Sequence, residues 1–296
     1  MCLPPAPDDA LRHGAHLRAH SVLFQACMTM SQPSIDADNA AFWSELCGSW
    51  LARSIGVQDA SRSGLQRFDE AYVRYYPYLV RHLRPIIERQ GATLEVGLGY
   101  GTVSGYLAQS GLDYHGLDIA PESVQLVRQR LDLLGVAGAA DRVQQGSALA
   151  LPWEDGRFDA LVSIGCLHHT GDLAGSIKEA HRVLTPGGVA MIMIYNANSL
   201  RQLMHGGLRS ALLRVLGRDP PAVRLDAYDA NSAGETAPFT ELTSVREARD
   251  LLAIFRSVGI VKENMSAMPR IRFPRERLLG WPARRLGLDL YITAIK

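Results

Sequence analysis

Residues 93–101 read TLEVGLGYG, an apolar strand pattern that passes through three glycines at alternate positions into a helical pattern. Glycine adopts backbone angles that other residues avoid, so Gly97, Gly99 and Gly101 predict a tight turn with bare backbone for a ligand. The start of the following helix offers free N–H groups to an anion. Glu95, at the end of the strand, offers a carboxylate to a cation. The segment therefore predicts a ligand that carries charges of both signs.

The glycine spacing distinguishes between two cofactors. A dinucleotide-binding turn uses G-x-G-x-x-G, but Thr102 replaces the third glycine counted from Gly97, and Ser104 replaces it counted from Gly99. NAD would bring a pyrophosphate to this turn, whereas S-adenosylmethionine (SAM) brings a carboxylate, an ammonium and a sulfonium. The pattern E-x-G-x-G-x-G therefore favours SAM, and a nicotinamide-dependent dehydrogenase is the less favoured alternative.

Three further strand ends carry residues that suit the same ligand. Asp118 closes the run YHGLDI, where a carboxylate can accept hydrogen bonds from ribose hydroxyls. Ser147 and Ala148 follow the next strand, where we expect the adenine, and Gly165 follows the fourth. Because carboxyl ends of parallel strands meet in one crevice of an open α/β sheet, these residues predict a single site.

Short apolar runs alternate with helical patterns between residues 92 and 196, which predicts an α/β fold with a parallel sheet. We expect strands at 92–96, 114–119, 142–146, 158–164 and 189–195, and two final strands at 259–266 and 289–296.

Capping residues and turn residues predict where the helices begin and end. Asp172 can cap a helix that follows the fourth strand, and TPGG at 185–188 predicts a turn before the fifth. Ser244 and Glu247 form a capping box for a later helix, which we expect to end near Gly259.

Four segments in this order and spacing resemble the class I SAM-dependent methyltransferases, especially the branch related to ubiquinone and menaquinone biosynthesis methyltransferases. They are LEVGLGYGT, HGLDIAPES, GSALALPWEDGRFDALVSIGCLHHT and IKEAHRVLTPGG. The resemblance is close over about residues 90–196 and loose beyond. It implies a Rossmann-like sheet of seven strands, mostly parallel, with the last strand antiparallel.

The resemblance also implies roles for individual residues. Glu95 and the three glycines would surround the methionine end of SAM, Asp118 would hold the ribose, and Ile119 would pack on the adenine. Ser147 departs from the aspartate that is usual in this family, although a serine hydroxyl can also accept the bond from the adenine amino group.

His168 and His169 are the candidate catalytic residues, because an imidazole can take a proton from the nucleophile near neutral pH. The alternative is that the pair only orders the loop that contains it. We predict substrate contacts at aromatic, amide and guanidinium side chains: Tyr72, Tyr76, Tyr195, Asn196 and Arg270. For the tyrosines the alternative is a role in the core, and for Arg270 a role on the solvated surface. No metal site is expected.

The chain divides into five expected segments. Residues 1–38 form a disordered or over-extended N-terminus and 39–90 a helical cap; 91–197 form the SAM-binding core, 198–243 a lid inserted after the fifth strand, and 244–296 the rest of the core with a basic insertion.

Composition limits the class of protein. A formal net charge of +1 gives no reason to expect a nucleic-acid partner, and no apolar run is long enough to span a bilayer. Four cysteines without paired spacing favour reduced thiols and a cytoplasmic location. A homodimer is compatible with these features.

The combined prediction is SAM-dependent methyl transfer to an oxygen, nitrogen, carbon or sulfur atom of a small molecule, as a step of biosynthesis. The alternatives are a SAM-binding regulatory or partner protein without catalysis and, less favoured, an RNA methyltransferase.

Overall fold

The computed structural model describes residues 31–45, 50–57, 61–138, 140–204, 229, 231, 234–265 and 274–296. The strands are β1 (Ala92–Val96), β2 (Asp113–Asp118), β3 (Val143–Gln145), β4 (Phe158–Ile164), β5 (Leu184–Tyr195), β6 (Ser257–Glu263) and β7 (Asp289–Ile295). The α-helices are α2 (Gln32–Glu45), α3 (Trp50–Ser54), α4 (Arg62–Tyr75), α5 (Leu79–Arg89), α6 (Thr102–Gln109), α7 (Pro121–Leu134), α8 (Leu173–Val183), α10 (Val245–Leu251), α11 (Arg275–Leu278) and α12 (Trp281–Leu286). Two short 3-10 helices are η2 (Ala140–Arg142) and η3 (Leu167–His169). No helix within the described ranges has the length and apolar character needed to cross a membrane.

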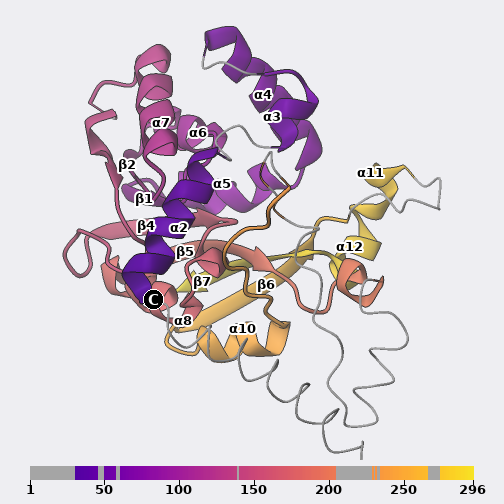
Figure 1. Cartoon of the computed structure of the whole chain (residues 1–296). Helices are drawn as coiled ribbons and strands as arrows, with labels where there is room; N and C mark the ends of the chain where they lie inside the picture. Colours follow the sequence, from indigo (N-terminus) through magenta and orange to yellow (C-terminus); the bar gives the residue numbers. More distant parts are fainter. Residues whose placement is uncertain are drawn as a thin grey trace, which may run out of the picture.

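The strands form one sheet in the order β3-β2-β1-β4-β5-β7-β6. β1 to β5 pair in parallel, whereas β7 is antiparallel to both β5 and β6. Apolar side chains of α5, α6 and α7 form the core on one face, and those of α8 and α10 form the core on the other (Figure 1). This is the predicted Rossmann-like architecture. The strand order reverses between β1 and β4, which is where such sheets open a ligand crevice.

β1 and β4 coincide with the predicted runs 92–96 and 158–164, whereas β5 is longer than expected. The turn predicted at TPGG lies inside β5 rather than before it: residues 185–188 belong to the strand, and Gly187 has the positive φ of 78° that is typical of a turn. The backbone there exchanges hydrogen bonds with the C-terminal residue: Gly187 N donates to Lys296 O at 3.0 Å, and Lys296 N donates to Gly188 O at 2.9 Å. Against β4, the extra residues appear as a shift in register.

The predicted helix caps are present, but one predicted helix end was wrong. The Asp172 carboxylate accepts from the backbone N–H of Gly175 at 2.8 Å and caps α8, and Ser244 and Glu247 form a complete capping box at α10. Helix α10 ends at Leu251 rather than near Gly259. Gly259 instead pairs with a residue of β7, so sheet hydrogen bonds replace the expected last turns of the helix.

Helix α2 begins at Gln32, inside the segment 1–38 for which disorder is expected from the sequence. Two long-range hydrogen bonds tie it to the loop after β4. The Gln32 side-chain amide donates to Thr170 O at 3.0 Å, and that of Asn39 donates to His169 O at 2.8 Å. The helix is therefore attached directly to the loop that contains the predicted histidines.

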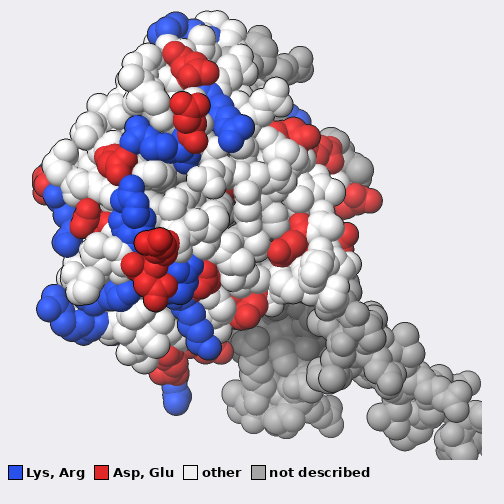
Figure 2. Space-filling view, turned by 90° about the vertical axis from the view of Figure 1, so that its left-hand side faces the viewer, with Lys and Arg blue, Asp and Glu red and all other residues white. Residues whose placement is uncertain are grey.

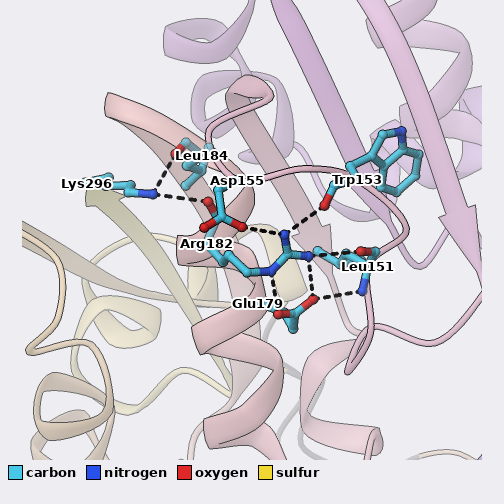
Figure 3. A network of polar contacts seen from close by, with 7 residues as sticks. All are labelled: Leu151, Trp153, Asp155, Glu179, Arg182, Leu184 and Lys296. Carbon is cyan, nitrogen blue, oxygen red and sulfur yellow. Dashed lines mark hydrogen bonds and ion pairs between the residues drawn. The ribbon is translucent and has the colours of Figure 1, made fainter.

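The segment that follows β3 is held by Arg182 at the end of α8 (Figure 3). Its guanidinium donates to the carbonyl oxygens of Leu151 at 2.9 Å and Trp153 at 2.7 Å. It also pairs with Glu179 at 2.7 Å and Asp155 at 2.9 Å. Charge-assisted bonds of this kind stabilise more than neutral ones, so they fix the segment that begins at the end of β3.

Charged side chains are distributed without a dominant sign over one face of the molecule. Figure 2 shows Lys and Arg side chains beside Asp and Glu side chains across this face. The mixture agrees with the formal net charge of +1. Attraction of a polyanion to this face would therefore be weak.

Candidate active site

A cavity of about 600 Å³ opens at the carboxyl ends of the strands. Its floor comes from the ends of β1, β2, β4 and β5, and its walls include side chains of α2 and α4 and the first residue of β7. All nine residues predicted to hold the cofactor line it: Glu95, Gly97, Gly99, Gly101, Asp118, Ile119, Ser147, Ala148 and Gly165. The structure therefore brings together residues that lie up to 70 positions apart in the sequence.

The glycine turn has the backbone that its sequence predicts. Gly97, Gly99 and Gly101 have φ values of 83°, 51° and 79°, in the left-handed region that favours glycine. A Cβ at Gly97 would lie 2.3 Å from Cys166 Cβ. A larger residue here would therefore have a strained backbone conformation and no space for its side chain. The turn ends where α6 begins, which leaves bare backbone and a helix start facing the cavity.

Glu95 is a buried carboxylate beside this turn, with 3% of its surface exposed. Its Oε2 accepts hydrogen bonds from the Ser104 hydroxyl at 2.6 Å and the Tyr114 hydroxyl at 2.7 Å, and neither bond uses Oε1. Burial raises the pKa of Glu95 to about 7 despite these two bonds. A cation in the cavity would stabilise the ionised form, so the site suits a ligand ammonium.

Asp118 supports the glycine turn as well as lining the cavity. Its Oδ2 accepts from the backbone N–H of Leu98 at 2.6 Å and of Gly99 at 3.4 Å, and its Oδ1 accepts from Ala120 N at 2.9 Å. Burial raises its pKa, and these backbone N–H bonds oppose the shift. Each carboxylate oxygen accepts more than one bond, so Asp118 can also accept from ribose hydroxyls. The sequence did not indicate its structural role.

The two predicted catalytic histidines occupy different environments. His169 lines the cavity, and its Nδ1 lies 2.6 Å from Phe239 O. A carbonyl oxygen only accepts, so Nδ1 carries the proton and the lone pair is on Nε2, which lies 3.6 Å from Asp229 Oδ2. Burial lowers the pKa of His169 and keeps the ring neutral near pH 7.

His168 does not line the cavity, contrary to its predicted catalytic role. Its side chain is 1% exposed, and its ring packs on Tyr195 and His169 at centroid distances of 4.3 and 4.1 Å. Burial lowers its pKa well below the usual value. The position of the ring indicates that His168 supports the two cavity residues beside it.

Of the predicted substrate residues, some line the cavity and others do not. Tyr72, Tyr76 and Tyr195 line the cavity. Asn196 does not, because it is fully buried: its Nδ2 donates to Gly287 O at 2.7 Å and its Oδ1 accepts from a neighbouring backbone N–H. It fixes the chain after β5 and has no surface on the cavity. Arg270 lies outside the described residues.

Several cavity residues were not predicted from the sequence. Charged and polar side chains in the wall are Asp36, Asn39, Arg201, Asp229, Asn264 and Asp289. Asp229 accepts from the Tyr195 hydroxyl at 3.1 Å, which places a carboxylate beside His169. The described residues contain no group of three His, Cys, Asp or Glu side chains placed to bind a metal ion.

Comparison with known proteins identifies the core of this chain. Residues 94–192 match the family described as methyltransferase domain. The chain is 32% identical over 110 residues to norajmaline N-methyltransferase of Rauvolfia serpentina, covering 36% of this chain and 37% of that protein. It is 28% identical over 127 residues to ubiquinone biosynthesis O-methyltransferase of Azorhizobium caulinodans, covering 43% and 48%. It is 30% identical over 174 residues to malonyl-[acyl-carrier protein] O-methyltransferase of Erwinia billingiae, covering 57% and 64%.

These matches cover about two fifths to two thirds of the relatives' lengths. As their names state, one of these relatives is an N-methyltransferase and the other two are O-methyltransferases. The resemblance predicted from the sequence is confirmed. Residues 94–192 of this chain are therefore a methyltransferase domain.

Proposed function

We propose that this chain transfers the methyl group of SAM to a small-molecule acceptor, as a step of biosynthesis. One observation carries the proposal: the same cavity is lined by the glycine turn, Glu95 and Asp118, here called the cofactor half, and by Tyr72 and His169, here called the acceptor half. The cofactor half has the donors and acceptors that SAM needs. The acceptor half is walled mainly by tyrosines and carboxylates, which suits a small organic molecule.

Different residues of the cofactor half would bind the positively and negatively charged groups of SAM. Glu95 would bind the ammonium group, and the backbone N–H groups at the start of α6 would bind the carboxylate. Asp118 would accept from the ribose, while Ile119 and Ser147 would border the adenine. SAM supplies an electrophilic methyl group on a sulfonium. The protein contributes mainly by holding the acceptor in line with that group and excluding water.

His169 is the proposed base for an acceptor that must lose a proton. Burial lowers the pKa of His169 and favours the neutral ring, Phe239 O accepts from Nδ1–H, and the lone pair would be on the buried Nε2, which lies 3.6 Å from Asp229 Oδ2. A neutral amine or a thioether would need no base, so His169 matters only for acceptors that attack after losing a proton.

The activity is tested by incubating the chain with SAM and a protein-free small-molecule fraction from cells that naturally express it, and by following S-adenosylhomocysteine (SAH). We expect SAH to accumulate only when the fraction is present, because the methyl group then has an acceptor. Mass spectrometry of the fraction should show a product heavier by one methylene. A folded chain that binds SAM but forms no SAH with any such fraction would favour the regulatory alternative.

A further inference from the structure

A buried carboxylate lies in the cavity wall far from the glycine turn. Asp289 is the first residue of β7, and two strands, β4 and β5, separate it from Glu95 in β1. It is 1% exposed and lines the cavity. Its Oδ1 accepts only a long bond of 3.4 Å from the Asn264 amide, and its Oδ2 has no hydrogen-bond partner among the described residues. Burying an ionised carboxylate with so few partners is costly, so a cationic group bound in the cavity would stabilise Asp289.

The groups around Asp289 do not supply a cationic partner. The Arg275 guanidinium lowers the pKa of Asp289, but it donates to Tyr75 O and, at 2.9 Å, to Asn264 Oδ1, and it forms no ion pair with Asp289. Glu263 raises the pKa of Asp289, and the nearby Tyr78 hydroxyl lowers it without forming a full hydrogen bond. Burial is the largest effect and raises the pKa of Asp289 to about 7.

Tyrosine rings line the same cavity as Asp289. Tyr72 and Tyr76 both line the cavity with ring centroids 4.8 Å apart; burial raises the pKa of both, and the charge of Asp289 adds a smaller effect in the same direction. The next ring, Tyr75, already holds a cation: the Arg275 guanidinium lies 3.9 Å from its centroid. The faces of tyrosine rings attract cations, most strongly where water is excluded.

Acidic side chains outnumber basic ones in the described part of the cavity wall. Its described residues include five carboxylates and one guanidinium: Asp36, Glu95, Asp118, Asp229, Asp289 and Arg201. With Glu95 and Asp118 assigned to SAM, the remaining charged residues of the wall are three carboxylates and Arg201. An anionic acceptor would be repelled by the carboxylates, whereas a cationic one would be attracted.

We propose that the acceptor carries a positively charged nitrogen group, which binds between the Asp289 carboxylate and the ring faces of Tyr72 and Tyr76. The inference rests on the proposed function only in calling this ligand the acceptor. The acceptor class is therefore small molecules that carry a protonated or quaternary nitrogen in addition to the nucleophilic atom that is methylated, and Asp289 is the residue that selects them.

The test uses two probes of the same shape, choline and its neutral carbon isostere 3,3-dimethylbutan-1-ol. Each is titrated calorimetrically into the whole chain saturated with SAH, at a pH above the pKa of Asp289. We expect choline to bind at least about tenfold more tightly than the isostere, since both the carboxylate and the ring faces contribute. Asp289→Asn should remove this preference, whereas Asp250→Asn, at an exposed carboxylate of α10, should leave it unchanged.

A second variant keeps the test decisive if Asp289→Asn fails to fold. Tyr76→Leu should weaken choline binding about three- to fivefold and leave the isostere unaffected, since only the cation interacts with the ring face. Equal binding of the two probes, no binding of either, or a preference that survives Asp289→Asn would overturn the inference. SAH binding is measured in the same samples. Normal SAH binding in those cases would leave the proposed function standing, and loss of SAH binding in the unaltered chain would count against the proposed function itself.

Discussion

Asp118→Ala is expected to weaken the binding of SAH by about 1.5–3 kcal/mol, or roughly 10- to 150-fold in Kd. The substitution removes the proposed acceptor of the ribose hydroxyls. It also removes the oxygen that accepts from Leu98 N and Gly99 N, so the glycine turn loses its support. Calorimetric titration of SAH measures the effect on binding, and circular dichroism checks that the sheet remains folded.

Asp113→Ala is the matched control for this experiment. Asp113 is a carboxylate at the opposite end of the same strand, paired with Arg142 and with Arg157 at 3.1 Å, and it does not line the cavity. Its loss should leave SAH affinity unchanged. An unchanged Kd in a folded Asp118→Ala chain would remove Asp118 from the cofactor site.

Gly97→Ala is expected to lower the free energy of unfolding by about 2–4 kcal/mol and to abolish detectable SAH binding. An alanine at φ 83° is strained, and its Cβ would lie 2.3 Å from Cys166 Cβ and 2.7 Å from Cys166 Sγ. The loop after β4 would have to move, and this loop forms part of the cavity wall. Urea unfolding measures the stability change.

Gly111→Ala separates the effect of backbone strain from that of overlap. Gly111 has φ 79°, nearly the value at Gly97, but a Cβ there would meet no atom within 4 Å. Strain alone should therefore cost about 1 kcal/mol, partly offset because alanine stiffens the unfolded chain. Equal losses in the two variants would show that contact with Cys166 contributes nothing to the requirement for glycine.

The cofactor half of the cavity was predictable from the sequence because each of its residues sits at the end of a strand. Parallel strands bring their carboxyl ends to one edge, so finding the strands was enough to place Glu95, Asp118 and Gly165 together. The role of Asp118 in holding Leu98 N was not predictable, because it depends on a contact between the end of β2 and the glycine turn.

The acceptor half depends on contacts that local pattern does not record. His168 and His169 are adjacent in the sequence, and only the packing of η3 decides that one faces the cavity and the other the core. Asn196 comes directly after Tyr195, the last residue of β5, yet its amide donates to the backbone carbonyl of Gly287.

Asp289 could have been found with one further step. The resemblance implies that the last strand is antiparallel, so its first residue, and not its last, lies at the carboxyl edge of the sheet. Asp289 indeed pairs with Tyr195 at the end of β5. Asp229 carried no such signal, since it lies outside the regular elements.

The central claim is that the glycine turn and Glu95 form a SAM site, and calorimetry with two ligands tests it most directly. SAH and NAD are titrated separately into the whole chain at equal concentrations. We expect saturable binding of SAH at one site and no binding of NAD. The turn lacks the third glycine of a pyrophosphate-binding loop, and the Glu95 carboxylate lies where a cationic group of the ligand would bind. Saturable binding of NAD together with no binding of SAH would contradict this claim.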